Sequence, residues 1–382
     1  MNGFDGELDA LRSMGCFRTL RTVEPIDGAH VRIDGRAFLS FAANDTLGLR
    51  RHPEVVAAAK AALDAYGLGA GASRLLAGTT PAHGRLEEAL AEFTRRERAL
   101  VFPSGYQTNV GVLTSLGGED DALILDALCH ASLIDAARLA KARMRVYPHA
   151  NVTKLAALLE RQRSSRRRIV VTEGVFSMDG DVAPLAQIVA LCERHDAWLV
   201  LDDAHGLGVL GATGRGTVEA LGVALGERSV YVATLSKALG SQGGFAAGSD
   251  ELVDLLVNRA RSFVYTTGLA PACAAGAEKA LTLLADPTRR EKLAKLSALA
   301  RERLRAVVPA VPEGMTPIIP VVVGEVDRAV ALAGRLLDAG ILAPAIRPPT
   351  VPKGTARLRI SLSADHTEDD VARLADVLED AF

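Results

Sequence analysis

The sequence has few aromatic residues, few cysteines, almost no net charge and no long hydrophobic run. Only 4% of its 382 residues are aromatic, and 44 Lys and Arg nearly balance 46 Asp and Glu. A nearly neutral chain gives no electrostatic reason to expect nucleic acid or an anionic membrane as the main partner. The apolar stretches fall short of the roughly 20 residues that a membrane span needs, and the first residues lack the apolar core of a signal peptide. We therefore expect a cytoplasmic protein.

The four cysteines stand alone in the sequence, at Cys16, Cys129, Cys192 and Cys273. Without CxxC pairs, and at this length, they do not form the framework of a disulfide-rich protein, so we expect reduced thiols. No HExxH or comparable ligand cluster is present, so we expect no metal.

The length predicts two domains. Residues 1–46 form an N-terminal segment that ends in a short extended piece, Ala37 to Phe41. A helix follows, with Pro53 in its first turn and Gly67 as its stop. Its predicted apolar face consists of Val55, Val56, Ala59, Ala62 and Leu63.

The large domain is predicted over residues 47–283, where short apolar runs alternate with helical segments. The runs are Ala99–Phe102, Leu123–Leu125, Ile169–Thr172, Trp198–Leu201 and Val230–Val232. Runs that are apolar throughout suit strands buried on both faces of a mostly parallel sheet. We expect an α/β fold.

Residues 284–382 predict a smaller C-terminal α+β domain. A strand at 318–323 and a helix at 327–339 precede two further extended pieces and a closing helix. Thr367 is the expected cap of that helix. Its predicted buried residues are Val371, Leu374, Val377 and Leu378.

Ionisable and hydroxyl side chains follow each of the five apolar runs. In chain order they include Ser104 and Tyr106, Asp126 and His130, Glu173 and Ser177, Asp202 and His205, and Thr234 and Lys237. In an open α/β sheet, ligands bind beyond the carboxyl ends of the strands. Each residue alone has a structural explanation, such as a surface lysine or a helix cap. Their joint placement at strand ends instead predicts a catalytic site.

This set matches the needs of pyridoxal 5′-phosphate (PLP). Lys237 offers an amine for a Schiff base with the cofactor aldehyde. Asp202, one strand earlier, offers a carboxylate for the pyridine nitrogen. The turn at Ser104-Gly105 opens a helix, whose N–H groups favour a phosphate. The GxGxxG at Gly206–Gly211 leaves a nicotinamide-dependent oxidoreductase as an alternative, but it runs into Ala-Thr-Gly-Arg-Gly, which cannot open the helix that this motif requires.

Seven ordered motifs resemble the α-oxoamine synthases, a branch of the fold-type I PLP-dependent transferases. They are Asn44–Leu49, Gly69–Gly78, Ser104–Tyr106, His130–Ser132, Thr172–Gly180, Asp202–Gly206 and Thr234–Lys237. The match covers nearly the whole chain. It departs from many relatives at Asp203, where they often have Glu.

The resemblance implies a role for each matching residue. Lys237 would form the Schiff base and take the α-proton, Asp202 would pair with the pyridinium, His130 would stack on the ring and His205 would bond the phenolic oxygen. Further cofactor contacts are implied for Gly105, Tyr106, Ser177 and Thr234, and for Thr266 and Thr267 toward the neighbour's phosphate in a homodimer. Substrate contacts are implied for Arg18, Arg21, Asn44, Arg347, Thr350 and Arg359, with Arg359 gripping the amino-acid carboxylate.

Within the family, the segment 346–359, with its Arg-Pro-Pro, resembles the branch that acts in biotin biosynthesis. That resemblance implies an acyltransferase that condenses L-alanine with pimeloyl-CoA or pimeloyl-carrier protein and releases CO2. Another α-oxoamine synthase, such as a glycine C-acetyltransferase, is the alternative within the family. A PLP-binding regulator without turnover is the alternative outside it, although the chain shows no added helix-turn-helix.

Overall fold

A computed structural model describes residues 3–308 and 310–381, which form two compact units. The central unit comprises Leu47–Ser177 and Asp181–Arg290. The terminal unit comprises the described parts of Met1–Thr46, Met178–Gly180 and Glu291–Phe382. Over the described ranges, no helix combines the length and the apolar character needed to cross a membrane.

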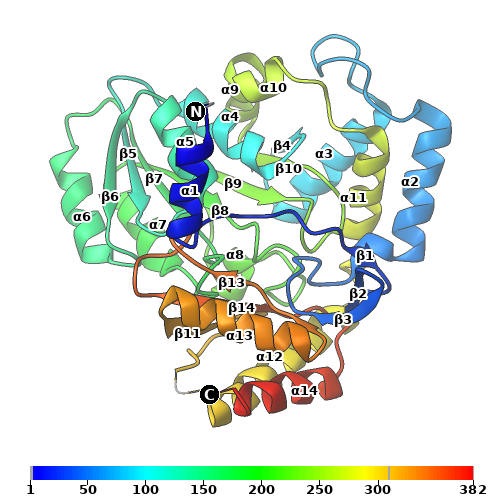
Figure 1. Ribbon diagram of the computed structural model, residues 1–382. Coiled ribbons are helices and arrows are strands. Elements are labelled where there is room, and N and C mark those ends of the chain that lie inside the picture. The colour runs from blue at the N-terminus through cyan, green and yellow to red at the C-terminus, as the bar shows by residue number, and fades with distance from the viewer. Residues whose placement is uncertain (1–2, 309, 382) are drawn as a thin grey trace. The chain divides into compact units, whose positions relative to one another are not determined.

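A seven-stranded sheet forms the core of the central unit (Figure 1). In spatial order its strands are β4 (Arg98–Phe102), β10 (Gly244–Gly248), β9 (Ser229–Thr234), β8 (Trp198–Asp202), β7 (Arg168–Glu173), β5 (Ala122–Asp126) and β6 (Arg143–Tyr147). Only β10 runs antiparallel to its neighbours. All five predicted strands are present, so the predicted mostly parallel α/β sheet is confirmed.

The sheet contains two strands that the sequence analysis did not predict. β6 lies at the sheet edge, and most of its side chains, arginines among them, are exposed. β10 is entirely buried, but its sequence GFAAG has low strand propensity. Neither strand has the apolar signature of the five others, because one is not buried and the other is too rich in small residues.

Helices connect the strands of the central unit. They are η1 (Leu49–Arg51), α2 (Pro53–Tyr66), α3 (Pro81–Thr94), α4 (Gly105–Leu116), α5 (Ala131–Leu139), α6 (Val152–Arg161), α7 (Leu185–Arg194), α8 (Thr217–Ala220), α9 (Asp250–Arg259), α10 (Arg261–Val264) and α11 (Pro271–Leu283). The predicted start and stop of α2 are confirmed. Its predicted apolar face is partly wrong, because Val56 and Leu63 are 36% and 37% exposed while Val55 and Ala62 are buried.

The terminal unit combines both ends of the chain. Its elements are α1 (Asp5–Ser13), β1 (Glu24–Pro25), β2 (His30–Ile33), β3 (Arg36–Ser40), most of α12 (Thr288–Val307), β11 (Ile318–Gly324), α13 (Val326–Asp338), β12 (Ile341–Leu342), β13 (Ala345–Ile346), β14 (Ala356–Ser361) and α14 (Glu368–Glu379). One sheet has the order β1-β2-β3-β12, and the other has the order β11-β14-β13. β12 pairs in parallel with β3, which joins segments some 300 residues apart in the chain, with Ile341 opposite Leu39.

Three strands, not the two predicted, lie between α13 and α14. The two-residue strands β12 and β13 are too short to leave a hydrophobic pattern in the sequence. Thr367 caps α14 as predicted, accepting the Asp370 N–H at 3.1 Å. Val371, Leu374 and Leu378 are buried, whereas Val377 is only half-buried.

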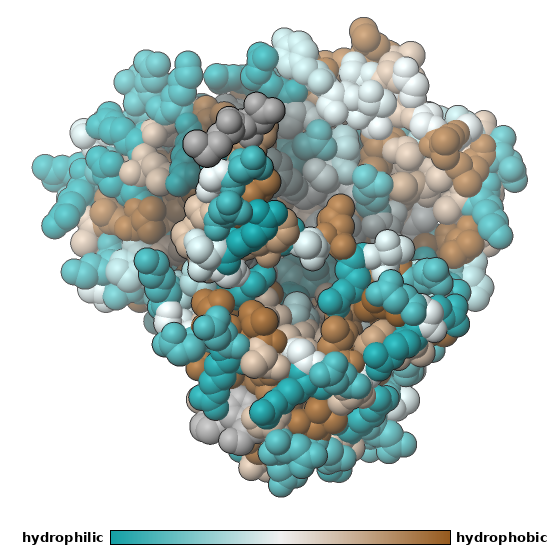
Figure 2. Space-filling model, viewed as in Figure 1, coloured by the Kyte–Doolittle hydropathy of each residue, from teal (hydrophilic) through white to brown (hydrophobic). Residues whose placement is uncertain are grey.

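Hydrophilic residues cover most of the face shown in Figure 2, with apolar residues in small groups. The buried apolar residues of the central unit lie around the sheet, whereas Leu68, Leu76 and Leu139 are exposed. The core includes Phe102 and Phe245, both fully buried.

Candidate active site

A cavity of about 260 Å³ opens at the carboxyl ends of β7, β8 and β9. It lies entirely within the central unit. Its lining residues are Ser104, Gly105, Tyr106, Asn109, His130, Ser132, Glu173, Asp202, Ala204, His205, Val232, Ala233, Thr234, Ser236 and Lys237. An amine, carboxylates, imidazoles and hydroxyls thus converge on one cavity, which is the arrangement expected of an active site.

Lys237 reaches the cavity from the turn that follows β9. Its Nζ lies 2.8 Å from Nε2 of His205, a buried histidine in the turn after β8. The turn closes at Gly240, which has φ +63° and whose Cβ, if it had one, would lie 2.2 Å from the backbone nitrogen of Arg50. Only glycine fits there. The chain around Lys237 is therefore held tightly, and its amine is partly withdrawn from water.

Asp202 ends β8, and its side chain is 7% exposed. Asn109 donates from Nδ2 to Asp202 Oδ2 at 2.8 Å, and the Ala204 N–H donates to Oδ1 at 3.1 Å. These two donors fix the position of the carboxylate in the cavity. A carboxylate held in this way can pair with a protonated ring nitrogen.

His130 caps α5 at the rim of the cavity. Its ring Nδ1 lies 2.8 Å from Ser132 Oγ, and its backbone N–H donates to Glu173 Oε1 at 2.5 Å. Burial lowers the pKa of His130, and although Asp202 opposes this effect, Lys237 adds to it. At neutral pH the ring is therefore uncharged and suited to stacking on a flat aromatic group.

The amino end of α4 forms an anion-binding end of the cavity. Ser104 caps the helix by accepting the Gln107 N–H at 3.2 Å, so Gly105 and Tyr106 occupy the first turn. Nearby, Thr234 Oγ1 lies 2.7 Å from Ser236 Oγ. Free N–H groups, a helix dipole and two hydroxyls together suit a phosphate.

Asn109, Ser132 and Ser236 line the cavity but were not predicted as site residues, whereas Ser104 was predicted as part of the turn that opens a helix toward a phosphate. Asn109 follows Gly105 by one helical turn, so the two share a face of α4. That spacing was a usable signal, because a helix that begins at a ligand carries its next polar contact four residues later. Ser132 and Ser236 gave no comparable signal.

Three predicted cofactor residues are not among the residues that line this cavity. Ser177 is half-buried beyond the end of β7. Thr266 accepts a hydrogen bond from Gln107 Nε2 at 3.4 Å, and Thr267 is exposed. Their contacts with the cofactor stay predictions.

The predicted substrate residues all belong to the terminal unit, where several pair with one another. Arg359 donates from Nη2 to Asn44 Oδ1 at 3.2 Å, and burial lowers its pKa to about 10. Arg18 donates from Nη2 to Thr350 Oγ1 at 3.4 Å. Arg347 donates to the Gly15 carbonyl, and Arg21 is exposed. Their contacts with substrate stay predictions.

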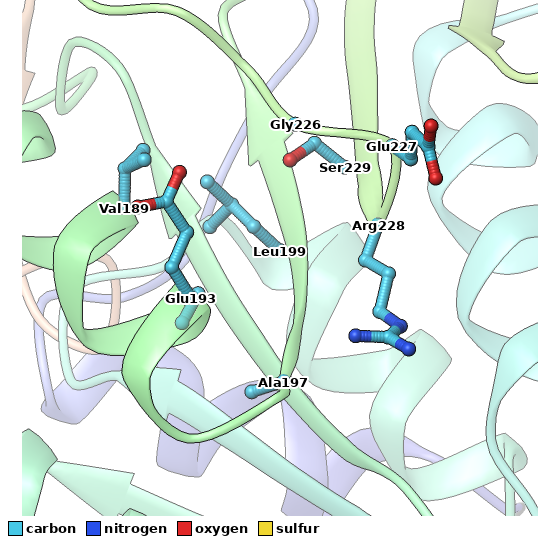
Figure 3. A pocket seen from close by; sticks show the side chains of 9 residues that line it. Val189, Glu193, Ala197, Leu199, Gly226, Glu227, Arg228 and Ser229 are labelled. Carbon is cyan, nitrogen blue, oxygen red and sulfur yellow. The ribbon is translucent and has the colours of Figure 1, made fainter.

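A second cavity, of about 310 Å³, lies at the amino ends of β8 and β9 (Figure 3). Its ionisable residues are Glu193, Glu227 and Arg228, all exposed, and Cys192, whose pKa burial raises to about 12. The lining contains no lysine or histidine. This cavity therefore lacks the amine, the buried carboxylates and the imidazoles found at the other end of the same strands.

The glycine-rich segment Gly206–Gly211 does not form a dinucleotide-binding turn. The next helix, α8, starts only at Thr217 and has four residues. A nicotinamide site needs a helix that opens directly at the glycines. The oxidoreductase alternative is therefore wrong.

The residues of the first cavity fit PLP. The amine of Lys237 suits the aldehyde of PLP, and the carboxylate of Asp202 suits its pyridine nitrogen. The imidazole of His130 suits the face of the ring, and the amino end of α4 suits the phosphate.

The comparisons with known proteins agree. The family model described as aminotransferase class I and II matches residues 36–378. A protein named 8-amino-7-oxononanoate synthase from Thioalkalivibrio sulfidiphilus (strain HL-EbGR7) is 46% identical over 380 residues, covering 99% of this chain and 97% of that protein. A solved serine palmitoyltransferase of Sphingomonas wittichii is 34% identical with a TM-score of 0.91, covering 99% of this chain and 96% of that one.

A further solved structure, described as SPT with a PLP internal aldimine, is 31% identical with a TM-score of 0.92, covering 99% of this chain and 97% of that one. The chain therefore belongs to the aminotransferase class I and II family and, within it, to the PLP-dependent α-oxoamine synthases, where it is most like the 8-amino-7-oxononanoate synthases.

Proposed function

We propose that this chain condenses L-alanine with pimeloyl-CoA or pimeloyl-carrier protein and releases 8-amino-7-oxononanoate, CO2 and the free thiol. The observation that carries the choice of reaction is the 46% identity, over 99% of the chain, to a protein named for that product. The cavity supports the chemistry, because it holds the groups that an amino-acid condensation through PLP requires.

Each end of the cofactor has a partner among the residues of the cavity. When bound, PLP supplies an aldehyde that condenses with amines and a ring that accepts the electrons of a carbanion. Asp202 would hold the pyridine nitrogen, and His130 would cover the ring. Gly105, Tyr106 and Thr234 would hold the phosphate, with Ser177 and the neighbour's Thr266 and Thr267 as further contacts.

Lys237 moves the proton in this proposal. Its Nζ takes the α-proton of the amino acid, which generates the nucleophile for the thioester carbonyl. His205, 2.8 Å away, holds the amine in place before the substrate enters. Loss of CO2 from the condensed product then leaves a carbon that takes a proton back from the same lysine.

The proposal assigns substrate contacts to residues of the terminal unit. Arg359 receives the amino-acid carboxylate, because a guanidinium binds a carboxylate through two parallel hydrogen bonds. Asn44, whose Oδ1 already accepts from Arg359, supports that guanidinium. Arg18 or Arg21, with Arg347 and Thr350, contact the acyl substrate.

A cytoplasmic homodimer completes the proposal. The four cysteines are free thiols, as expected in a reducing compartment. Two further reactions of the same family are the alternatives: transfer of a short acyl group to glycine, and condensation of a long acyl group with serine, as the names of the similar solved structures indicate.

Substrate competition tests the proposal. L-alanine, glycine and L-serine are each supplied with pimeloyl-CoA, acetyl-CoA and palmitoyl-CoA, and thiol release is followed. We expect the highest kcat/KM for L-alanine with pimeloyl-CoA. Turnover of glycine with acetyl-CoA, or of serine with palmitoyl-CoA, without turnover of the alanine pair would overturn it.

A further inference from the structure

Glu173 is a second carboxyl group in the cavity, next to Asp202. The two residues end the paired parallel strands β7 and β8, directly opposite each other in register. In-register neighbours on parallel strands point to the same face of a sheet, and both side chains line the cavity. Glu173 is 4% exposed and is the only buried glutamate among the described residues.

When two neighbouring carboxyl groups are withdrawn from water, ionising both is unfavourable, because the two negative charges repel each other with little screening. Asp202 accepts two hydrogen bonds, from Asn109 and from the Ala204 N–H. Glu173 accepts one, from the His130 N–H. Glu173 has fewer hydrogen-bond donors than Asp202, so of the two carboxyl groups Glu173 is the one that keeps a proton more readily.

The charges around Glu173 lead to the same assignment. The titratable groups that face it are Asp202, Asp126, Lys237, His130 and Cys129. Burial first, and then the charge of Asp202, raise the pKa of Glu173 well above its usual range, with Asp126 acting in the same direction. Lys237 and the His130 hydrogen bond oppose this shift without cancelling it.

We propose that Glu173 keeps its proton at neutral pH, so that the cavity presents one negative carboxylate, and not two, to the phosphate-bearing cofactor. Glu173 is then a positioning residue. Its Oε1 fixes the backbone of His130 at the start of α5. Because Glu173 is neutral, only Asp202 would repel the negatively charged phosphate of the cofactor. This inference rests on the proposed PLP chemistry.

Pyridoxamine 5′-phosphate is the probe, because it lacks the aldehyde and its binding does not depend on reaction with Lys237. Its affinity for the cofactor-free full chain is measured at pH 7 and pH 10, in the wild type and in Glu173→Gln. We expect the two affinities to agree within about 3-fold at pH 7. If Glu173 were ionised, glutamine would remove a negative charge and tighten binding by about 10-fold or more at pH 7, which would overturn the proposal.

Glu251→Gln is the matched control, since it makes the same charge change at an exposed position of α9. Its affinity should equal that of the wild type at both pH values. If Glu251→Gln tightened binding as well, the comparison at Glu173 would report net charge rather than the cavity.

Infrared spectroscopy of wild-type protein labelled with ¹³C-glutamate tests the proton directly and needs no variant. At pH 8 we expect one carbonyl band of a protonated acid that shifts with the label, because the other described glutamates are not buried. Absence of that band would overturn the inference. Failure of the wild type to bind any B6 phosphate would instead overturn the proposed function, and the band would still report on Glu173.

Discussion

The two ends of β8 and β9 each open on a cavity, and they differ in where their charged groups lie. At the carboxyl ends, Asp202 and His205 are each 7% exposed, around a volume of about 260 Å³. At the amino ends the cavity is larger, about 310 Å³, but its charged residues Glu193, Glu227 and Arg228 are exposed (Figure 3). Charge withdrawn from water, and not volume, marks the reactive end, because electrostatic interactions strengthen as water is excluded.

The largest expected effect is a loss of activity from a substitution at the carboxyl ends of β8 and β9 but not from one at their amino ends. Lys237→Ala removes the amine that binds the cofactor and moves the α-proton, so kcat should fall by more than about 100-fold. The band of the lysine-bound cofactor in the visible spectrum, which borohydride reduces, should also disappear. Arg228→Ala at the opposite cavity is the control and should leave kcat within about 2-fold of the wild type. Equal losses in both variants would contradict the distinction between the ends.

A smaller effect on kcat/KM is expected from Asn109, which supports Asp202 in the cavity at the carboxyl ends of the strands. Asn109→Ala removes the amide that donates to Asp202 Oδ2, and a hydrogen bond to a charged group is worth about 1.5–3 kcal/mol. We therefore expect kcat/KM to fall by about 10-fold or more. Thr114→Ala lies on the same helix, and its hydroxyl donates to helix carbonyls, chiefly Val110 O, so it controls for loss of helix stability. An unchanged kcat/KM in Asn109→Ala would show that Asp202 needs no such support.

The smallest effect concerns stability, at the carboxyl ends of β5 and β6. His149 bridges Asp126 at 3.0 Å and Asp181 at 2.7 Å. Burial alone would lower the pKa of His149, but its hydrogen bonds to Asp126 and Asp181 outweigh it and raise the pKa from 6.5 to about 10.

A raised histidine pKa stabilises the folded protein fully below pH 6.5, and the stabilisation is lost as the pH rises through about 10. The difference in urea midpoint between the wild type and His149→Gln should therefore be largest at pH 6 and shrink toward pH 10. His195→Gln, at the end of α7, is the control. A difference that does not change with pH would mean that His149 acts through packing against Phe176 alone.

Much of the central sheet could be predicted, because buried parallel strands are apolar along their whole length. β5, β7, β8 and β9 have this signature, and the polar residues after them are found at one edge of one sheet. Sequence could not predict β10, whose alanines and glycines are buried because β4 and β9 flank it and the helices α3, α4 and α9 pack against it.

Among the residues of the cavity, too, some could be predicted from the sequence and others could not. Lys237, Asp202, His205 and His130 were all predicted, and all of them line the cavity. Asn109 was missed although it follows Gly105 by one helical turn, because the local sequence does not show that its amide meets Asp202, on a strand far along the chain. The residues that follow Gly206–Gly211 already argued against a nicotinamide-dependent oxidoreductase, because they cannot open a helix.

The sequence by itself determined which strands are buried and that an amine and a carboxylate follow two of them, since burial on both faces and strand-end chemistry are written in local residue patterns. Only the tertiary structure decided that β9 lies beside β8, that β3 pairs with β12, and that Glu173 faces Asp202 across a strand pair. These are contacts between segments distant in the chain. The charge state of a buried carboxyl group depends on such contacts, because its neighbours replace the water that would otherwise stabilise its charge.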